Sequence, residues 1–176
     1  MGKRLTALAL AAGLILGGCG YSLSPSPYGL MESLTVSVPV AANQSRYADL
    51  GPMLTTDVIS RLNASPSISV RENSASTLRL EIKHVSISGG AWETKRDDNT
   101  PINSASRVVH VSVEAILERP GPEGGAPLVR RNVFMSQRNF LVTSEQAQLE
   151  LQQNEAFKWI VSDLGQKISQ IMFSEF

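Results

Sequence analysis

The segment RVVHVSVEAILE, residues 107–118, decides the fold of this chain. Apolar and polar residues alternate through it, and a period of two predicts a β-strand that is buried on one face. The inward face carries five apolar residues: Val109, Val111, Val113, Ala115 and Leu117. The outward face carries His110, Ser112, Glu114 and Glu118. The segment therefore predicts the centre of a sheet with one face turned to a core.

The segments on either side predict the two neighbouring strands. Residues 77–88 alternate in the same way, but the parity of the apolar residues switches after Ile82, so we expect a bulge or twist near Lys83 and His84. Residues 128–142 return as a strand with a less regular pattern, after a Gly/Pro-rich hairpin loop at 119–127. We interpret residues 89–106 as a polar loop. These segments together predict a three-stranded meander.

Earlier residues predict a strand–helix–strand unit. Residues 34–40 alternate strictly, and Pro39 suits a strand end or an edge. A helix is expected from about Gly51, or slightly earlier, to about Asn63, since Leu50, Leu54, Val58 and Leu62 recur every four residues. Residues 67–71 predict a short strand. A crossover of this kind favours a parallel pair of strands.

A long amphipathic helix closes the chain. Thr143 or Ser144 is its expected cap, with Gln146 completing a capping box, and the helix should end near Met172. Its first half is polar and would project past the sheet. Its apolar stripe consists of Phe157, Ile160, Val161, Leu164, Ile168 and Ile171. The predicted fold is α+β, a two-layer sandwich of a small, mixed, mostly antiparallel sheet with two helices on one face.

The first residues predict export and lipidation. Lys3 and Arg4 precede a short apolar run, and small residues stand directly before Cys19, the single cysteine of the chain. This pattern is typical of a signal peptide that is removed, and Cys19 then has one obvious use, which is acylation. The alternative is an ordinary signal peptide with a chance cysteine. We expect a signal peptide at 1–18, a lipidated flexible tether at 19–33 and a single domain at 34–176. Gly20, in place of an acidic residue, favours the periplasmic side of the outer membrane.

Charge and motifs argue against several functions. The chain without residues 1–18 has a net charge of −2, because Lys3 and Arg4 are lost from a balanced total of 16 basic and 16 acidic residues. No basic excess points to nucleic acid. His110, Ser112 and Glu114 share a strand face at a spacing too wide for direct proton transfer, and His84 fits a bulge better than a metal site. The sequence predicts no enzyme, no cofactor and no metal.

Five basic residues are candidates for a phosphate-binding group. Lys95 and Arg96 lie in the polar loop, Arg107 begins the central strand, and Arg130 and Arg131 lie on the following strand. Lys95, Arg96 and Arg107 could gather at one end of a meander and hold phosphates through charge-assisted hydrogen bonds. The alternative is a solvated charged end, with Asp97 and Asp98 neutralising the loop pair.

Several segments resemble the LPS-assembly lipoprotein family, LptE. They are Cys19-Gly20-Tyr21, residues 76–88 (STLRLEIKHVSIS), the strand 108–117, the Gly/Pro hairpin, residues 131–140 (RNVFMSQRNF) and the polar-then-apolar last helix. The resemblance implies a non-enzymatic lipoprotein that plugs the large outer-membrane β-barrel LptD, helps it to assemble and takes part in lipopolysaccharide transport. Only Cys19, the acylated residue, carries over from the family residue by residue.

Two further interpretations stay open at this point. The protein could be a periplasm-facing lipoprotein scaffold of another envelope complex. An anchored envelope hydrolase is the weaker alternative, since no nucleophile and base are paired in the sequence. The barrel LptD, lipopolysaccharide and the outer membrane, through N-terminal acyl chains, are the expected partners.

Overall fold

The computed structural model describes residues 34–97, 100–121, 125–142 and 145–174, and it describes no side chain from 90 to 105. The chain divides into two compact units, Met1–Met31 and Glu32–Phe176, and the fold below is that of the second unit. The predicted signal peptide, Cys19 and the tether lie outside the described residues.

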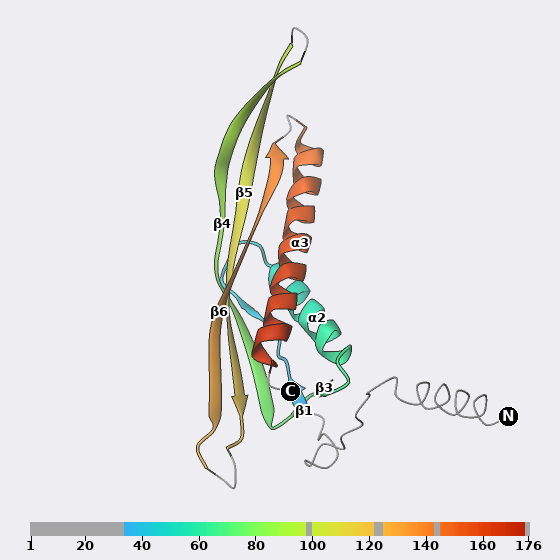
Figure 1. Ribbon diagram of the computed structural model, residues 1–176, viewed down its shortest axis with the longest axis vertical. Coiled ribbons are helices and arrows are strands. Elements are labelled where there is room, and N and C mark those ends of the chain that lie inside the picture. Colours follow the sequence, from blue (N-terminus) through green and yellow to red (C-terminus); the bar gives the residue numbers. More distant parts are fainter. Residues whose placement is uncertain (1–33, 98–99, 122–124, 143–144, 175–176) are drawn as a thin grey trace, which may run out of the picture. The chain divides into compact units, whose positions relative to one another are not determined.

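A six-stranded mixed sheet forms one layer (Figure 1). Its strands are β1 (Leu34–Ser37), β2 (Ala42–Asn43), β3 (Ile68–Val70), β4 (Ser76–Asp97), β5 (Thr100–Arg119) and β6 (Leu128–Val142). The order is β3-β1-β4-β5-β6, and β2 pairs with β4 beyond the end of β1. The pair of β1 and β3 is parallel, as predicted for the crossover, whereas β4, β5 and β6 form an antiparallel meander.

Two helices form the other layer, both on the same face of the sheet (Figure 1). Helix α2 (Leu50–Asn63) contacts β2, β3 and β4, and α3 (Gln146–Met172) contacts β5 and β6. The helices also contact each other, where Arg61 of α2 donates to the Ser162 carbonyl and hydroxyl of α3 at 3.1 and 2.9 Å. The predicted α+β two-layer sandwich is therefore confirmed.

The predicted core faces are also confirmed. The five inward residues of β5 and the four-residue repeat of α2 are all at most 4% exposed. They pack against Leu78, Leu80 and Ile82 of β4 and against the apolar stripe of α3. The expected bulge is present as a shift of register between Ile82 and His84. After the shift, Val85 and Ile87 return to the core side, which explains the switch of parity in the sequence.

A buried threonine joins the β1–β2 connection to α2. Thr55 Oγ1 accepts a hydrogen bond from the Ala41 N–H at 2.8 Å and donates one to the Gly51 carbonyl at 2.9 Å. Gly51 itself has no room for a side chain, because a Cβ there would lie 2.7 Å from the Ala41 carbonyl oxygen. These contacts set how closely α2 approaches the sheet.

Two predictions about strands were wrong. The described residues of the predicted loop 89–106 are strands: β4 continues to Asp97, β5 starts at Thr100, and the two pair as a ladder beyond Ala105, where β6 ends. The ladder extends through backbone hydrogen bonds between the two strands, and these bonds need no apolar side chains. The strand predicted at 34–40 stops at Ser37, just before Pro39, and Val40 is 67% exposed.

The last helix differs from its prediction in three details. Its N-cap is Glu145, which makes no side-chain cap, while Thr143 and Ser144 lie outside the described residues. Met172 is fully buried and Ile171 is 45% exposed, so Met172 completes the apolar stripe in place of Ile171. The polar first half lies beside β6, and the β4–β5 hairpin, not the helix, extends furthest (Figure 1).

Candidate functional surface

The outer face of the sheet, opposite the helices, carries a network of charges at β4, β5 and β6. Lys83 contacts Glu81 at 2.8 Å and Glu114 at 3.2 Å, and Arg131 contacts Glu114 at 3.5 Å. The hydrogen bonds to Glu81 and Glu114 raise the pKa of Lys83. Glu114 contacts both cations and Glu81 contacts Lys83, so the two cations and two carboxylates of this network balance.

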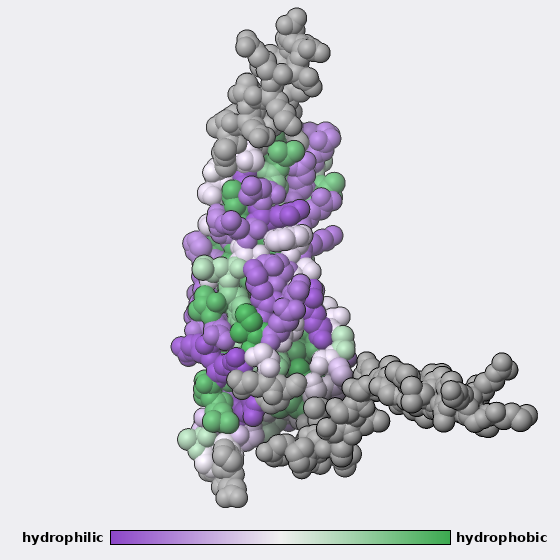
Figure 2. All heavy atoms as spheres, in the orientation of Figure 1, coloured by the Kyte–Doolittle hydropathy of each residue, from purple (hydrophilic) through white to green (hydrophobic). Residues whose placement is uncertain are grey.

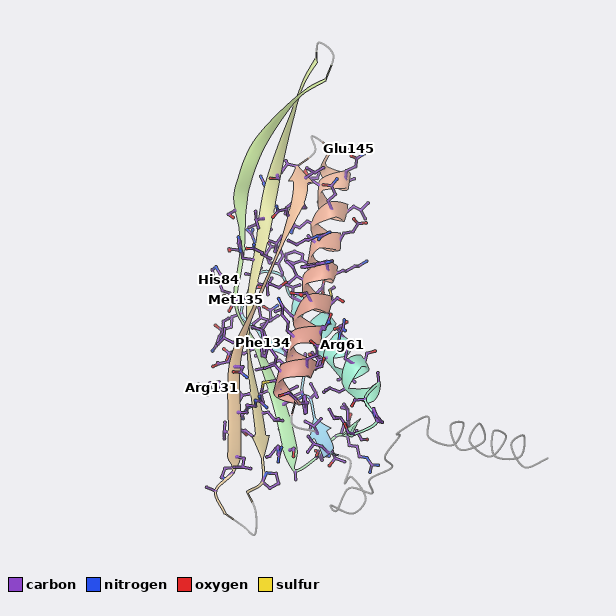
Figure 3. All side chains as sticks on the ribbon, in the orientation of Figure 1. Arg61, His84, Arg131, Phe134, Met135 and Glu145 are labelled. Atoms are coloured by element: carbon purple, nitrogen blue, oxygen red, sulfur yellow. The ribbon has the colours of Figure 1, made fainter. Side chains whose placement is uncertain are left out.

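The two histidines lie on this outer face as strand residues. His84 pairs with Ser112 across the β4–β5 ladder, and His110 pairs with Ser86. His84 points away from the helices (Figure 3). Both line a cavity of about 400 Å³ together with Ser112. Within the described residues, no group of His, Cys, Asp and Glu could hold a metal ion.

Exposed apolar side chains follow the outward side of β6. We call Val129, Val133, Met135 and Leu141 the β6 strip; their exposed fractions are 56, 60, 72 and 54%. Their partners on β5 are mostly polar: Glu118, Glu114, Ser112 and Ser106. Figure 2 shows hydrophobic side chains among hydrophilic ones over this strand. A row of this kind on a folded domain marks a contact surface more often than a lone exposed residue does.

The other side of β6 faces α3 and is packed. Phe134 and Phe140 are buried there, and Phe134 points toward the helix (Figure 3). The Arg138 guanidinium stacks over the Trp159 ring at 4.7 Å from its centroid. Trp159 is still 43% exposed, so this cation–π pair lies at the rim of the interface between β6 and α3.

Lys167 of α3 reaches across to the open edge of β6. Its Nζ donates to the Met135 carbonyl at 3.1 Å and to Asp163 Oδ2 at 2.6 Å. Burial raises the pKa of Asp163, but the hydrogen bond and the positive charge of Lys167, with the nearby Ser136 hydroxyl, outweigh that effect, so the pKa lies below the ordinary value of 3.8. Asp163 thus stays ionised and holds Lys167 at the strand edge.

The five candidate basic residues do not form one cluster. Arg130 faces the helices, where it donates to the Met172 carbonyl at 3.5 Å at the end of α3, whereas Arg131 lies on the outer face beside Glu114. Arg107 pairs with Gly89 and Phe140, about 30 Å along β5 from the position opposite Arg130. Lys95 and Arg96 lie on the β4 extension, where they pair with Ile102 and Pro101. Lys95, Arg96 and Arg107 therefore share one arm of the hairpin, and Arg130 and Arg131 lie at the other end of the sheet.

Sequence reasoning missed the β6 strip and its open edge. The available signal was the irregular pattern of residues 128–142, in which apolar residues occur at both parities. On a strand with one buried face, that pattern means that some apolar residues face outward.

A model of a known family covers most of this domain. The model is LptE, described as lipopolysaccharide-assembly, and it matches residues 34–170, from the first residue of β1 almost to the end of α3. The chain belongs to the LptE family. The predicted membership is thereby confirmed, and a general role in lipopolysaccharide assembly comes with it. No curated protein sequence matches this LptE-family chain significantly.

Solved structures resemble this chain at low identity. A protein of Caulobacter crescentus provisionally assigned as a lipoprotein is 12% identical, with 81% of this chain and 89% of that chain covered and a TM-score of 0.51. Rare lipoprotein B of Shewanella oneidensis is 18% identical, with coverages of 80% and 95% and a TM-score of 0.46. The first likeness supports the fold alone. Among the described residues of this LptE-family member, no helix is both long and apolar enough to cross a membrane.

Proposed function

We propose that this protein is an outer-membrane lipoprotein that plugs the lipopolysaccharide-inserting β-barrel LptD, helps it to assemble and takes part in moving lipopolysaccharide to the cell surface. The observation that carries the proposal is the LptE-family match, which spans almost the whole two-layer domain, residues 34–170. A role without catalysis agrees with the histidines, which are ordinary strand residues on the outer face.

Membrane attachment is proposed through Cys19. After cleavage, acyl chains on this residue would hold the domain on the periplasmic side of the outer membrane. Stable anchoring needs more than one such chain. Cys19→Ala should leave an unprocessed or mislocalised protein in fractionated envelopes. A processed Cys19→Ala protein that still fractionates with the outer membrane would refute the anchor.

Lipopolysaccharide contacts are proposed for the five basic residues, as two separate groups. The first group consists of Arg131, on the outer face beside Glu114, and Arg130, which faces the helices at the same end of β6; side chains of this kind can bind phosphates through charge-assisted hydrogen bonds. The arm residues Lys95, Arg96 and Arg107 form the second group. Because exposed phosphate contacts are screened over about 8–10 Å at 0.1–0.15 M salt, binding should weaken as salt rises.

Alanine variants of the two groups separate their contributions. Lys95→Ala with Arg96→Ala removes two charges from the arm, and Arg131→Ala removes one beside the β6 strip. Binding of purified lipopolysaccharide should fall in each variant, with a shallower dependence on salt. Arg79→Ala is the matched control, since Arg79 is an exposed arginine of the outer face already paired with Glu118. Unchanged binding in both groups would remove these residues from the proposed function.

Depletion tests the assembly role itself. The amount of correctly folded LptD barrel and the amount of surface lipopolysaccharide should fall together when the protein is depleted. If the barrel stays at its normal level while another envelope complex fails, the protein is a scaffold of that complex instead.

A further inference from the structure

The two edges of the sheet differ greatly in length. At one edge lies β3, with three residues, Ile68–Val70. At the other edge lies β6, with fifteen residues, Leu128–Val142. Each of these residues is paired with a residue of β5. No strand in the described part of the chain pairs with the outer side of β6. Folded proteins usually keep such edges short or covered, because an open strand is a template for pairing.

The unpaired backbone groups of β6 belong to the same residues as the β6 strip. The Met135 carbonyl accepts its hydrogen bond from Lys167 of α3, so it points away from β5. Since peptide groups alternate in direction along a strand, Val133 and the other residues of that parity also direct their N–H and C=O groups to the open edge. A strand added there would gain backbone hydrogen bonds and apolar neighbours from the same positions.

Apart from its three arginines, β6 lacks most of the features that normally protect an edge. Residues 128–142 include no proline, glycine, aspartate or glutamate, and the pairing of β5 with β6 shows no shift of register. In the described residues the single side chain that binds the edge backbone is Lys167. One flexible lysine can be displaced by an incoming strand, whereas a bulge or a proline cannot.

Charge indicates what kind of strand fits. Three arginines, Arg130, Arg131 and Arg138, lie on β6, which has no acidic residue of its own, and Lys167 adds a fourth cation at the edge. Arg131 contacts Glu114 and Lys167 contacts Asp163, so the cations have partners but outnumber the neighbouring carboxylates. A second copy of the chain would bring the same cations to this edge. If the two β6 strands paired antiparallel around Met135, the two Lys167 side chains would lie close to each other. Like charges placed opposite each other destabilise a strand pair. Complementarity therefore favours a different polypeptide with acidic residues.

We propose that β6 takes up an extended segment of its partner protein, with alternating apolar and acidic residues, as an additional strand of the sheet. The apolar residues would cover the β6 strip on the outer face, and the acidic ones, on the helix side, would meet Arg138 and Lys167. Strand addition of this type combines backbone hydrogen bonds for affinity with alternating side chains for specificity. The inference rests on the proposed function in one respect, since it takes the barrel LptD as the partner.

Substitutions at Val133 test strand addition in the full-length lipoprotein. Val133→Pro removes an N–H that points to the open edge and leaves the pairing with β5 intact, a position where strands tolerate proline. Val133→Lys keeps the N–H and places a charge in the β6 strip. It tests the same position if the proline variant fails to fold. Val40→Lys is the control, since Val40 is similarly exposed at 67% but lies outside the β6 strip.

The readout is the amount of barrel that co-purifies with each variant in mild detergent, with a thermal melt of the same sample to verify folding. We expect about tenfold less barrel with folded Val133→Pro or Val133→Lys, equivalent to about 1.4 kcal/mol, and no change with Val40→Lys. Full recovery of barrel with both folded Val133 variants would overturn strand addition. If the wild-type protein itself brings down no barrel, the proposed function fails instead. A wild-type homodimer that Val133→Pro dissociates would show that a second copy, not a partner, occupies β6.

Discussion

Replacing Thr55 by valine isolates the hydrogen bond that joins α2 to the β1–β2 connection. Valine has nearly the same shape as threonine, so the change opens no cavity, but it removes the acceptor of the Ala41 N–H. Ala41 is 5% exposed, so no water replaces that acceptor easily. An orphaned buried donor costs about 1–3 kcal/mol. For a domain of this size that predicts a melting temperature lower by about 3–10 °C.

Amide hydrogen exchange and thermal melts together measure this effect. Thr55→Ser is the matched control, because it keeps both hydrogen bonds and loses only a methyl group, worth about 0.8 kcal/mol. The Ala41 amide should exchange much faster in Thr55→Val and stay protected in Thr55→Ser. If the Ala41 amide is equally protected in both variants, the Thr55 contact does not hold this connection and the reasoning is wrong.

Two other predictions concern the sheet and the edge of β6. Val113→Asp should unfold the protein or lower its stability by more than about 4 kcal/mol, since Val113 is fully buried, while Ser112→Asp on the outer face should cost far less; equal losses in chemical denaturation would contradict the assigned faces. Asp163 has a lowered pKa, so the stability it contributes is present above pH 3.8 and is lost as the pH falls through its lower value in the folded protein. Asp163→Asn should therefore reduce stability near neutral pH and flatten its acid dependence, and identical acid profiles of the two proteins would refute this role.

Much of the fold could be predicted because buried faces repeat with the period of their element. The five inward residues of β5 and the four of α2 are spaced as a strand and a helix require, and each set is buried. The bulge after Ile82 was visible for the same reason, since it shifts the parity of the apolar residues. These features depend only on local geometry and on a single core.

The errors concern features that the backbone or the neighbouring strands control. Residues 89–106 lack an apolar pattern, yet β4 and β5 continue to pair there, because a ladder that has begun can extend through backbone hydrogen bonds alone. Apolar and polar residues continue to alternate after Ser37, but β1 ends where its pairing with β4 ends. Strand β2 then pairs with β4 further along that strand. Sequence periodicity holds no information on either event.

The candidate site was less predictable than the fold. Arg130 and Arg131 are adjacent on a strand, so alternation alone places them on opposite faces, and the predicted basic cluster could have been divided in this way from the sequence. The open edge of β6 could not, because it follows from the order of the strands in the sheet. The β6 strip was recorded in the sequence only as an irregular pattern at 128–142.

The central claim is that this lipoprotein works in a complex with the lipopolysaccharide-inserting barrel. Its most direct test is to isolate the native protein from envelopes in mild detergent and to measure the mass and composition of the complex. We predict one lipoprotein bound to one LptD barrel. A protein that is isolated alone, or with a different envelope complex and no barrel, would contradict the account.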